Sequence, residues 1–186
     1  DHRDLHSFPT RRSSDLGNIR DLPRQTCDVL IIGTGLAGIY TALHLDPALR
    51  VILLNKGGLD ESNSLIAQGG IAAAVAPGDS PRQHFDDSWA AGAALNDPAA
   101  LNILVSEGPE NIRLLREWGV PFDLDSDGAL AVTREGAHHR DRIVHCRGDS
   151  TGFYVTRTLA DRLAAQENCL LLNRTCLVDF LTDAQS

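Results

Sequence analysis

Residues 27–38, CDVLIIGTGLAG, constrain the fold more than any other stretch, because a strand pattern leads directly into a glycine-rich turn. Residues 29–32 form a continuous apolar run, which is typical of a parallel strand covered on both faces. Gly33, Gly35 and Gly38 then have the spacing of a turn that lets backbone approach a pyrophosphate. A helix that starts at such a turn directs free N–H groups towards phosphate. The sequence therefore predicts a Rossmann-like α/β fold that binds a dinucleotide.

The residues after this turn complete a β-α-β unit. Apolar and small residues in 36–45 fit a helix packed on a sheet, and residues 51–54 fit a second parallel strand. An NAD-binding unit usually carries Asp or Glu at the end of this second strand. Asn55 and Lys56 stand there instead. This difference weakens the NAD interpretation and favours an amide or cationic contact.

The segment 62–76, SNSLIAQGGIAAAVA, is the second informative stretch. It combines small polar residues, a Gln-Gly-Gly turn and a run of small apolar residues. Such a composition lets the backbone lie close to a flat ligand. A tight loop entering a buried strand or helix would explain the same residues, and spacing alone does not separate the two interpretations.

Together, the GTGLAG turn, Asn55-Lys56-Gly57 and the NSLIAQGGIAA segment resemble the flavoprotein family of succinate dehydrogenase, fumarate reductase and L-aspartate oxidase. The resemblance covers residues 26–183 and implies FAD, not NAD, on a Rossmann-like α/β domain with a central parallel sheet. It assigns the cofactor contacts to two segments and two single positions: Gly33, Thr34, Gly35, Leu36, Ala37, Gly38, Lys56, Asn63, Ser64, Leu65, Ile66, Ala67, Gln68, Gly69, Gly70 and Cys176.

One departure from the respiratory members and one matching signature indicate the L-aspartate oxidase branch of that family. The respiratory flavoproteins typically carry a histidine that bonds covalently to the flavin where this chain has Asn63, so we expect non-covalent FAD. The TREG sequence at 133–136 resembles a signature of L-aspartate oxidases, in which the glutamate matching Glu135 is an active-site residue that faces the substrate amino group. A dicarboxylate can be bound by cations alone, but an ammonium needs an anion nearby. Without the resemblance, Glu135 would be a surface residue paired with Arg134 or Arg140.

The reaction implied by this resemblance is the oxidation of L-aspartate to iminoaspartate with oxygen or fumarate as acceptor. It is the first step towards quinolinate in NAD biosynthesis, and it makes quinolinate synthase a candidate partner. Two alternatives stay open. One is a soluble fumarate reductase or succinate dehydrogenase flavoprotein, and the other is an inactive truncated chain that binds at best part of FAD.

Composition excludes several other classes of protein. The chain has 186 residues and a net charge of -8, and residues 25–186 contain no Lys/Arg-rich block, which argues against nucleic acid as a partner. No apolar run approaches the roughly 20 residues needed to cross a bilayer. The four cysteines form no C-x-x-C pair, which favours a reducing cytoplasm over a disulfide framework or zinc ribbon.

The expected organisation is simple. Residues 1–16 lack apolar periodicity and read as a non-native or disordered leader. Residues 17–186 then read as the incomplete, N-terminal portion of the FAD-binding domain, with the capping and C-terminal helical domains absent.

Further elements follow from local signals. We expect a helix at 81–94 capped by Ser80, a helix capped by Asn96 or Asp97 and interrupted at Gly108-Pro109, and another ending at Trp118. A helix at 152–165 and strands at 169–172 and 176–181 complete the chain.

Two polar clusters invite a metal interpretation that we reject. Residues 123–128 mimic the start of a calcium loop, but Arg134 stands where its twelfth ligand, a glutamate, belongs, so a solvated hairpin turn is favoured. His138 and His139 are neighbours that would point to opposite faces of an extended chain, and we interpret them as polar loop residues. No metal site is predicted.

Overall fold

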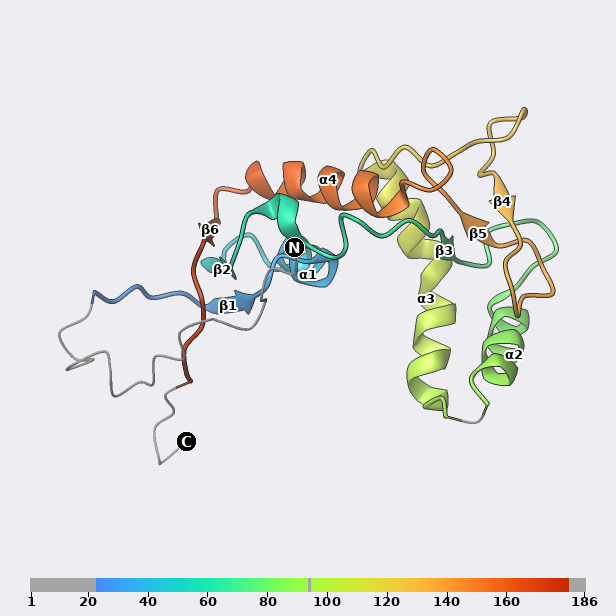
Figure 1. Ribbon diagram of the computed structural model, residues 1–186, viewed down its shortest axis with the longest axis horizontal. Helices are drawn as coiled ribbons and strands as arrows, with labels where there is room; N and C mark the ends of the chain where they lie inside the picture. Colours follow the sequence, from blue (N-terminus) through green and yellow to red (C-terminus); the bar gives the residue numbers. More distant parts are fainter. Residues whose placement is uncertain (1–22, 94, 181–186) are drawn as a thin grey trace, which may run out of the picture.

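The structure is a computed structural model that describes residues 23–93 and 95–180. Figure 1 shows an elongated molecule with a parallel sheet and helix α1 at one end and helices α2 and α3 with a small antiparallel sheet at the other. Helix α4 spans the distance between them. The predicted leader, residues 1–16, and Leu181 of the last predicted strand lie outside the described residues.

The parallel sheet has the strand order β1-β2-β6, formed by β1 (Val29–Ile32), β2 (Val51–Asn55) and β6 (Cys169–Asn173). Helix α1 (Leu36–His44) connects β1 to β2, and α4 (Thr151–Ala164) precedes β6. These elements confirm the predicted β-α-β unit and the α/β fold class.

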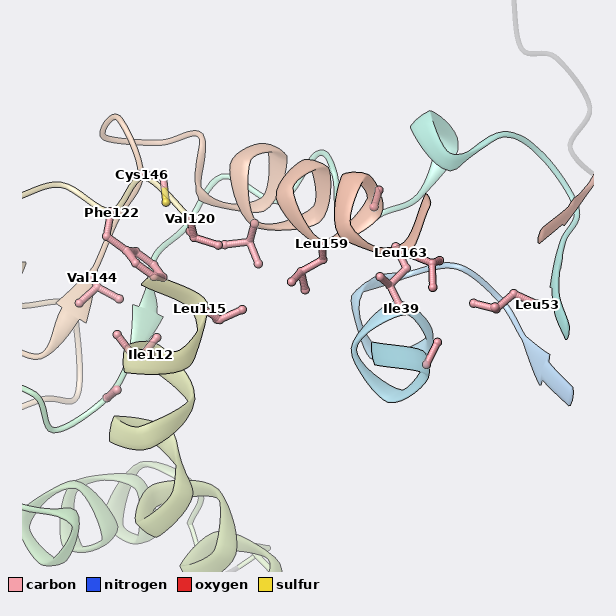
Figure 2. Packing of buried hydrophobic residues seen from close by; sticks show 14 of the residues in the cluster. Ile39, Leu53, Ile112, Leu115, Val120, Phe122, Val144, Cys146, Leu159 and Leu163 are labelled. Carbon is pink, nitrogen blue, oxygen red and sulfur yellow. The ribbon is translucent and has the colours of Figure 1, made fainter. Parts of the chain in front are cut away.

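One face of this sheet packs against α1 and α4, and this contact belongs to a buried cluster that also contains Ile112, Leu115 and Phe122. Figure 2 shows Leu159 and Leu163 of α4 facing Ile39 of α1, with Leu53 of β2 close by. All four side chains are buried. Since burying one such side chain contributes about 1.5–3 kcal/mol, this contact fixes both helices on the sheet.

The other face of the sheet is open over the residues that the structure describes. Leu30 and Ile32 of β1 are 45% and 47% exposed, and Leu170 of β6 is 46% exposed. The expectation that β1 is covered on both faces is therefore wrong for the described part of the chain. The physical reason is that α1 and α4 both pack on the opposite face, against alternate residues such as Ile31.

The second sheet is small and antiparallel, with the order β3-β5-β4, formed by β3 (Ile71–Ala72), β5 (Ile143–Val144) and β4 (Val132–Thr133). Helices α2 (Pro81–Ala91) and α3 (Pro98–Glu117) lie side by side next to it. A short 3-10 helix at Leu59–Glu61 follows β2. The segment 62–76 therefore includes a loop that enters strand β3, as one of the two interpretations of its sequence predicts.

Helices α2 and α3 begin at the predicted caps. The Ser80 hydroxyl accepts a hydrogen bond from the Gln83 N–H, and the Asp97 carboxylate accepts one from the Ala100 N–H. Helix α2 ends at Ala91, earlier than predicted.

The predicted interruption at Gly108-Pro109 is wrong, because α3 continues through Pro109 to Glu117. A proline inside a helix loses one backbone hydrogen bond. Here Val105 and Ile112, on either side of Pro109, are both buried on the same face, so their packing offsets that loss.

The predicted strand at 176–181 is also wrong within the described residues, since the chain after β6 has no regular structure. Arg174 has a φ of 53°, which turns the chain away from the strand direction. The Thr175 N–H then donates to the Asn55 carbonyl oxygen at 2.9 Å, so the chain stays close to the end of β2.

The aspartate-rich stretch forms a hairpin turn, as predicted. Leu124 pairs with Leu130, and the Asp125 carboxylate accepts hydrogen bonds from the N–H groups of Asp127 and Ala129, both at 2.9 Å. Within residues 23–93 and 95–180 no group of three or more His, Cys, Asp or Glu side chains is arranged to hold a metal ion. In the same residues no helix combines the length and apolarity needed to cross a membrane.

Replacing Gly38 tests the packing of α1. A Cβ at this position would collide with the Gly33 carbonyl oxygen and lie 3.3 Å from Ile31 Cγ2. We expect Gly38→Ala to lower the free energy of unfolding by about 1–3 kcal/mol in a denaturant titration. Gly136→Ala is the control, because a Cβ there meets nothing within 4 Å. Equal stability of the two variants would contradict this account of the turn.

Candidate functional site

A cavity of about 550 Å³ lies at the carboxyl ends of β1 and β2. In open α/β sheets, ligands bind at this edge. Its walls come from the glycine turn, the end of β2, the loop after β2 and the chain after β6. Another cavity of about 440 Å³ lies at the opposite end of the strands, near Arg50 and Asn168, where such ligands are not expected.

The glycine turn directs the start of α1 into the cavity wall. Gly33 has a φ of 102°, a conformation that glycine adopts readily, and its N–H donates to the Leu54 carbonyl oxygen at 2.8 Å. Gly35 is the residue before α1, and the Leu36 N–H donates to the Ser64 hydroxyl oxygen at 3.0 Å. The first N–H groups of a helix have no partner within the helix, so this end offers donors to an anion.

The loop of residues 62–70 contacts the first residues of both α1 and α4. Ser64 contacts α1, and the Ala67 carbonyl oxygen accepts a hydrogen bond from the N–H of Gly152 in α4 at 3.0 Å. A Cβ at Gly152 would collide with the carbonyl oxygens of Ser64 and Ala67. The small residues of this loop therefore allow close backbone contact, and Gly152, which the sequence analysis did not identify, is needed for it.

The chain after β6 forms the remaining wall. The Arg174 N–H donates to the Gly57 carbonyl oxygen at 3.1 Å, and the Thr175 N–H donates to Asn55. These bonds bring Cys176 into the lining of the cavity.

The structure brings together seven of the residues that the sequence assigned to a cofactor. The cavity is lined by Gly33, Thr34, Gly35, Lys56, Asn63, Ser64 and Cys176. Three others, Leu36, Ala37 and Gly38, form the first turn of α1 behind it.

The remaining predicted contacts lie away from this cavity. Leu65 lines a separate cavity on α4, and Ile66 is exposed. Gln68 and Gly69 are exposed as well, while Gly70 packs against β5. Ala67 is likewise exposed, although its carbonyl oxygen binds α4.

Glu135 lies in the loop between β4 and β5, and its side chain is 54% exposed. Its Oε1 is 3.9 Å from His145 Nε2, which also hydrogen-bonds the Thr133 hydroxyl at 2.9 Å. A Cβ at Gly70 would lie 2.7 Å from His145 Cε1. Glu135 and the Gln-Gly-Gly turn thus both lie next to the ring of His145, although Gly70 and Glu135 are far apart in the sequence. Arg134, a predicted alternative partner of Glu135, pairs with Asp141 at 3.7 Å.

A buried ion-pair cluster, which the sequence did not predict, lies at the end of the loop between β4 and β5. Arg142 is fully buried and donates two hydrogen bonds of 2.9 Å to Asp79 and one of 2.9 Å to Asp87. Asp87 also accepts a hydrogen bond from the His139 N–H at 2.9 Å and one from its ring. Nothing in the sequence distinguishes Arg142 from the exposed Arg140.

The cluster changes the ionisation of its members. Burial by itself would raise the pKa of Asp87, but the two hydrogen bonds from His139 and the charge of Arg142 lower that pKa to about 2. Burial, reinforced by the nearby Arg142 charge, lowers the pKa of His84, whose ring contacts His138. Asp87 is therefore the charged member that holds Arg142 and His139 together.

The residues around the larger cavity suit a phosphate-bearing ligand. The start of α1 supplies N–H donors, Ser64 a hydroxyl and Lys56 an ammonium group. Gly35 carries no side chain that would keep a pyrophosphate away from the backbone, while Gly38 lets α1 pack closely on the turn. A dinucleotide with a pyrophosphate fits this set of groups.

Comparison with known proteins identifies the dinucleotide. Residues 28–186 match the family described as "FAD binding domain". The chain belongs to this family of FAD-binding domains. The cofactor of this domain is therefore FAD, as the resemblance implied.

Curated relatives of this FAD-binding chain include L-aspartate oxidases. The one from Streptomyces coelicolor is 45% identical over 164 residues, which cover 85% of this chain and 27% of the relative. The one from Nostoc sp. is 44% identical over 167 residues, which cover 90% of this chain and 28% of the relative. The chain therefore spans little more than a quarter of the length of these relatives.

Solved structures of flavoproteins share the fold. Escherichia coli quinol fumarate reductase FrdA gives a TM-score of 0.81 at 28% identity, over 85% of this chain and 27% of that chain. The Mycobacterium smegmatis Sdh1 complex gives a TM-score of 0.78 at 27% identity, over 82% of this chain and 28% of that chain. The domain is therefore that of the succinate dehydrogenase and fumarate reductase flavoproteins.

The lowered pKa of Asp87 predicts an acid-dependent contribution to stability. A carboxyl group with a folded-state pKa of about 2, below its ordinary 3.8, stabilises the folded state above pH 4. That contribution is lost as the pH falls towards 2. Urea titrations of Asp87→Asn at a series of pH values should show a shallower loss of stability over this range than the unmodified chain. Asp86→Asn is the control because Asp86 is exposed and pairs with the exposed Arg82. Parallel pH curves for all three proteins would contradict the prediction.

Proposed function

We propose that this chain is the amino-terminal part of an L-aspartate oxidase, an FAD-dependent oxidoreductase that converts L-aspartate to iminoaspartate. The position of Glu135 carries the proposal, because it puts an exposed carboxylate beside His145, against which the Gln-Gly-Gly turn packs. The identities of 45% and 44% with curated L-aspartate oxidases support it. We call the protein that extends this chain to the length of those relatives the parent protein.

The cofactor-binding role is distributed along the cavity. The N–H groups at the start of α1 and the Ser64 hydroxyl would hold the pyrophosphate of FAD. Lys56 and Asn55, at the end of β2, would hold the ribose region, and the backbone near Cys176 the adenine. Bound FAD supplies the hydride-accepting chemistry, which side chains of a protein do not provide.

Glu135 is the proposed catalytic residue because it selects and orients the substrate. L-Aspartate differs from succinate by an ammonium group on the reacting carbon. A carboxylate facing that ammonium binds it by a charge-assisted hydrogen bond, which fixes the direction of the Cα–H bond. Succinate and fumarate lack this group and gain nothing from Glu135.

The electron acceptor, the use of the product, a partner and the cellular location are part of the same proposal. Oxygen or fumarate would be the electron acceptor, and the product would be the precursor of quinolinate in NAD biosynthesis. Quinolinate synthase is a candidate partner, and the scattered cysteines favour a cytoplasmic location.

A soluble fumarate reductase or succinate dehydrogenase flavoprotein is the second candidate, and the TM-score of 0.81 with quinol fumarate reductase FrdA favours it. Asn63 and Glu135 favour the oxidase. A chain that is inactive by itself is compatible with either candidate, since it spans only 27% of the Streptomyces coelicolor relative.

Replacing Glu135 separates the two enzyme candidates. In the parent protein, Glu135→Gln should lower kcat/KM for L-aspartate by about 10- to 100-fold, the range expected for one hydrogen bond to a charged group. Fumarate reduction should change less than about threefold, because fumarate carries no ammonium. Steady-state assays of both reactions measure this, with the exposed Glu110→Gln on α3 as control. Equal losses in both reactions would rule out the proposed role.

The state of the flavin gives an independent test. Asn63 has no nucleophilic ring nitrogen, so FAD should be held without a covalent bond. Acid precipitation of the parent protein should therefore release all of its flavin into the supernatant, as measured by absorbance. Yellow flavin that stays with the pellet would show that another residue bonds to it.

A further inference from the structure

The loop that carries Glu135, residues 134–142, has few interactions of its own. The His138 N–H donates to the Glu135 carbonyl oxygen at 3.3 Å. Arg134 and Asp141 form an ion pair at 3.7 Å, and both are largely exposed. Surface ion pairs of this kind contribute little. The position of Glu135 must therefore depend on where the loop contacts the body of the protein.

The main anchor is at the end of the loop. The Arg142 N–H donates to the Thr133 carbonyl oxygen at 3.0 Å, which closes the base of the loop. The Arg142 guanidinium is fully buried, with Nε and Nη2 donating to Asp79 and Nη1 donating to Asp87. Since a buried charge without its partner is costly, Arg142 cannot leave this position easily.

Asp87 also holds a second point of the same loop. One of its oxygens accepts the hydrogen bond from the His139 N–H, and the other is bonded to the His139 ring. Asp87 lies on α2 and is buried, whereas the His139 side chain is 85% exposed. A single carboxylate of α2 thus fixes the loop at residues 139 and 142, after Glu135.

We propose that Asp87, acting through Arg142 and His139, is a positioning residue that holds Glu135 where it meets the substrate ammonium. Asp87 would not touch the substrate or the flavin. Its effect on selectivity would come from the rigidity that it gives to the loop. The proposal rests on the proposed function, because it needs an ammonium-bearing substrate.

A double-mutant cycle in the parent protein tests it. Asp87→Asn should raise KM and lower kcat/KM for L-aspartate by about tenfold, since a displacement of about 1 Å can cost up to 100-fold in rate. For fumarate, KM and kcat/KM should change less than about threefold. When Glu135→Gln is already present, adding Asp87→Asn should have no further effect, because both changes remove the same interaction.

Limited trypsin digestion supplies a readout that does not depend on activity. A released loop should be cut faster after Arg134 and Arg140 in Asp87→Asn than in the unmodified protein. Asp86→Asn is the matched control, since the neighbouring Asp86 on α2 pairs with the exposed Arg82 and not with the loop. It should leave both the cleavage rate and KM unchanged.

Several results would overturn the positioning role of Asp87. An unchanged KM and cleavage rate in Asp87→Asn overturns the proposal, and so do losses that multiply with those of Glu135→Gln. Equal losses for aspartate and fumarate indicate a merely structural role and also overturn it. If Asp87→Asn does not fold, His139→Ala is the variant to test, because the exposed His139 ring can be removed with Arg142 still paired. A normal rate of trypsin cleavage in His139→Ala would then overturn the proposal. No effect of Glu135→Gln alone would instead refute the proposed function.

Discussion

The structure depends first on the close approach of α1 to the turn that precedes it. There is no space for a side chain between Gly38 and the Gly33 carbonyl oxygen, so the helix starts directly at the edge of the parallel sheet. Its first N–H groups then face the space beyond β1 and β2, where the cavity lies. A larger residue at position 38 would move the helix and its donors together. The affinity of the domain for a pyrophosphate is therefore a consequence of packing as much as of charge.

The loop of residues 62–70 contacts both the helix that begins at this turn and the end of the molecule that contains the antiparallel sheet. It contacts the starts of α1 and α4 through Ser64 and Ala67, and it ends at Gly70, which packs against β5. Strand β5 follows the loop that carries Glu135. The cofactor cavity and the loop that carries Glu135 are thus connected by contacts of this one segment. The close approach at Gly70 leaves no room for a side chain there.

Local chemistry made much of the fold predictable. The strand-turn-helix pattern fixed the β-α-β unit, and the Ser80 and Asp97 caps set the starts of α2 and α3 because their partners lie three residues away. The failures involve contacts made by distant parts of the chain. Pro109 does not break α3, because tertiary packing around it overrides the local signal. Arg142 could not be identified, because Asp87 and Asp79 lie 55 and 63 residues away in sequence.

We propose that one domain aligns FAD at the glycine turn with a substrate ammonium at Glu135. A crystal structure of the parent protein with FAD and L-aspartate, prepared without oxygen, would test this alignment. We expect the pyrophosphate against the first turn of α1 and Ser64, with the Glu135 carboxylate within about 3.2 Å of the substrate ammonium, the outer limit of an N–H···O hydrogen bond. A Glu135 side chain turned to solvent while another group binds the ammonium would contradict it.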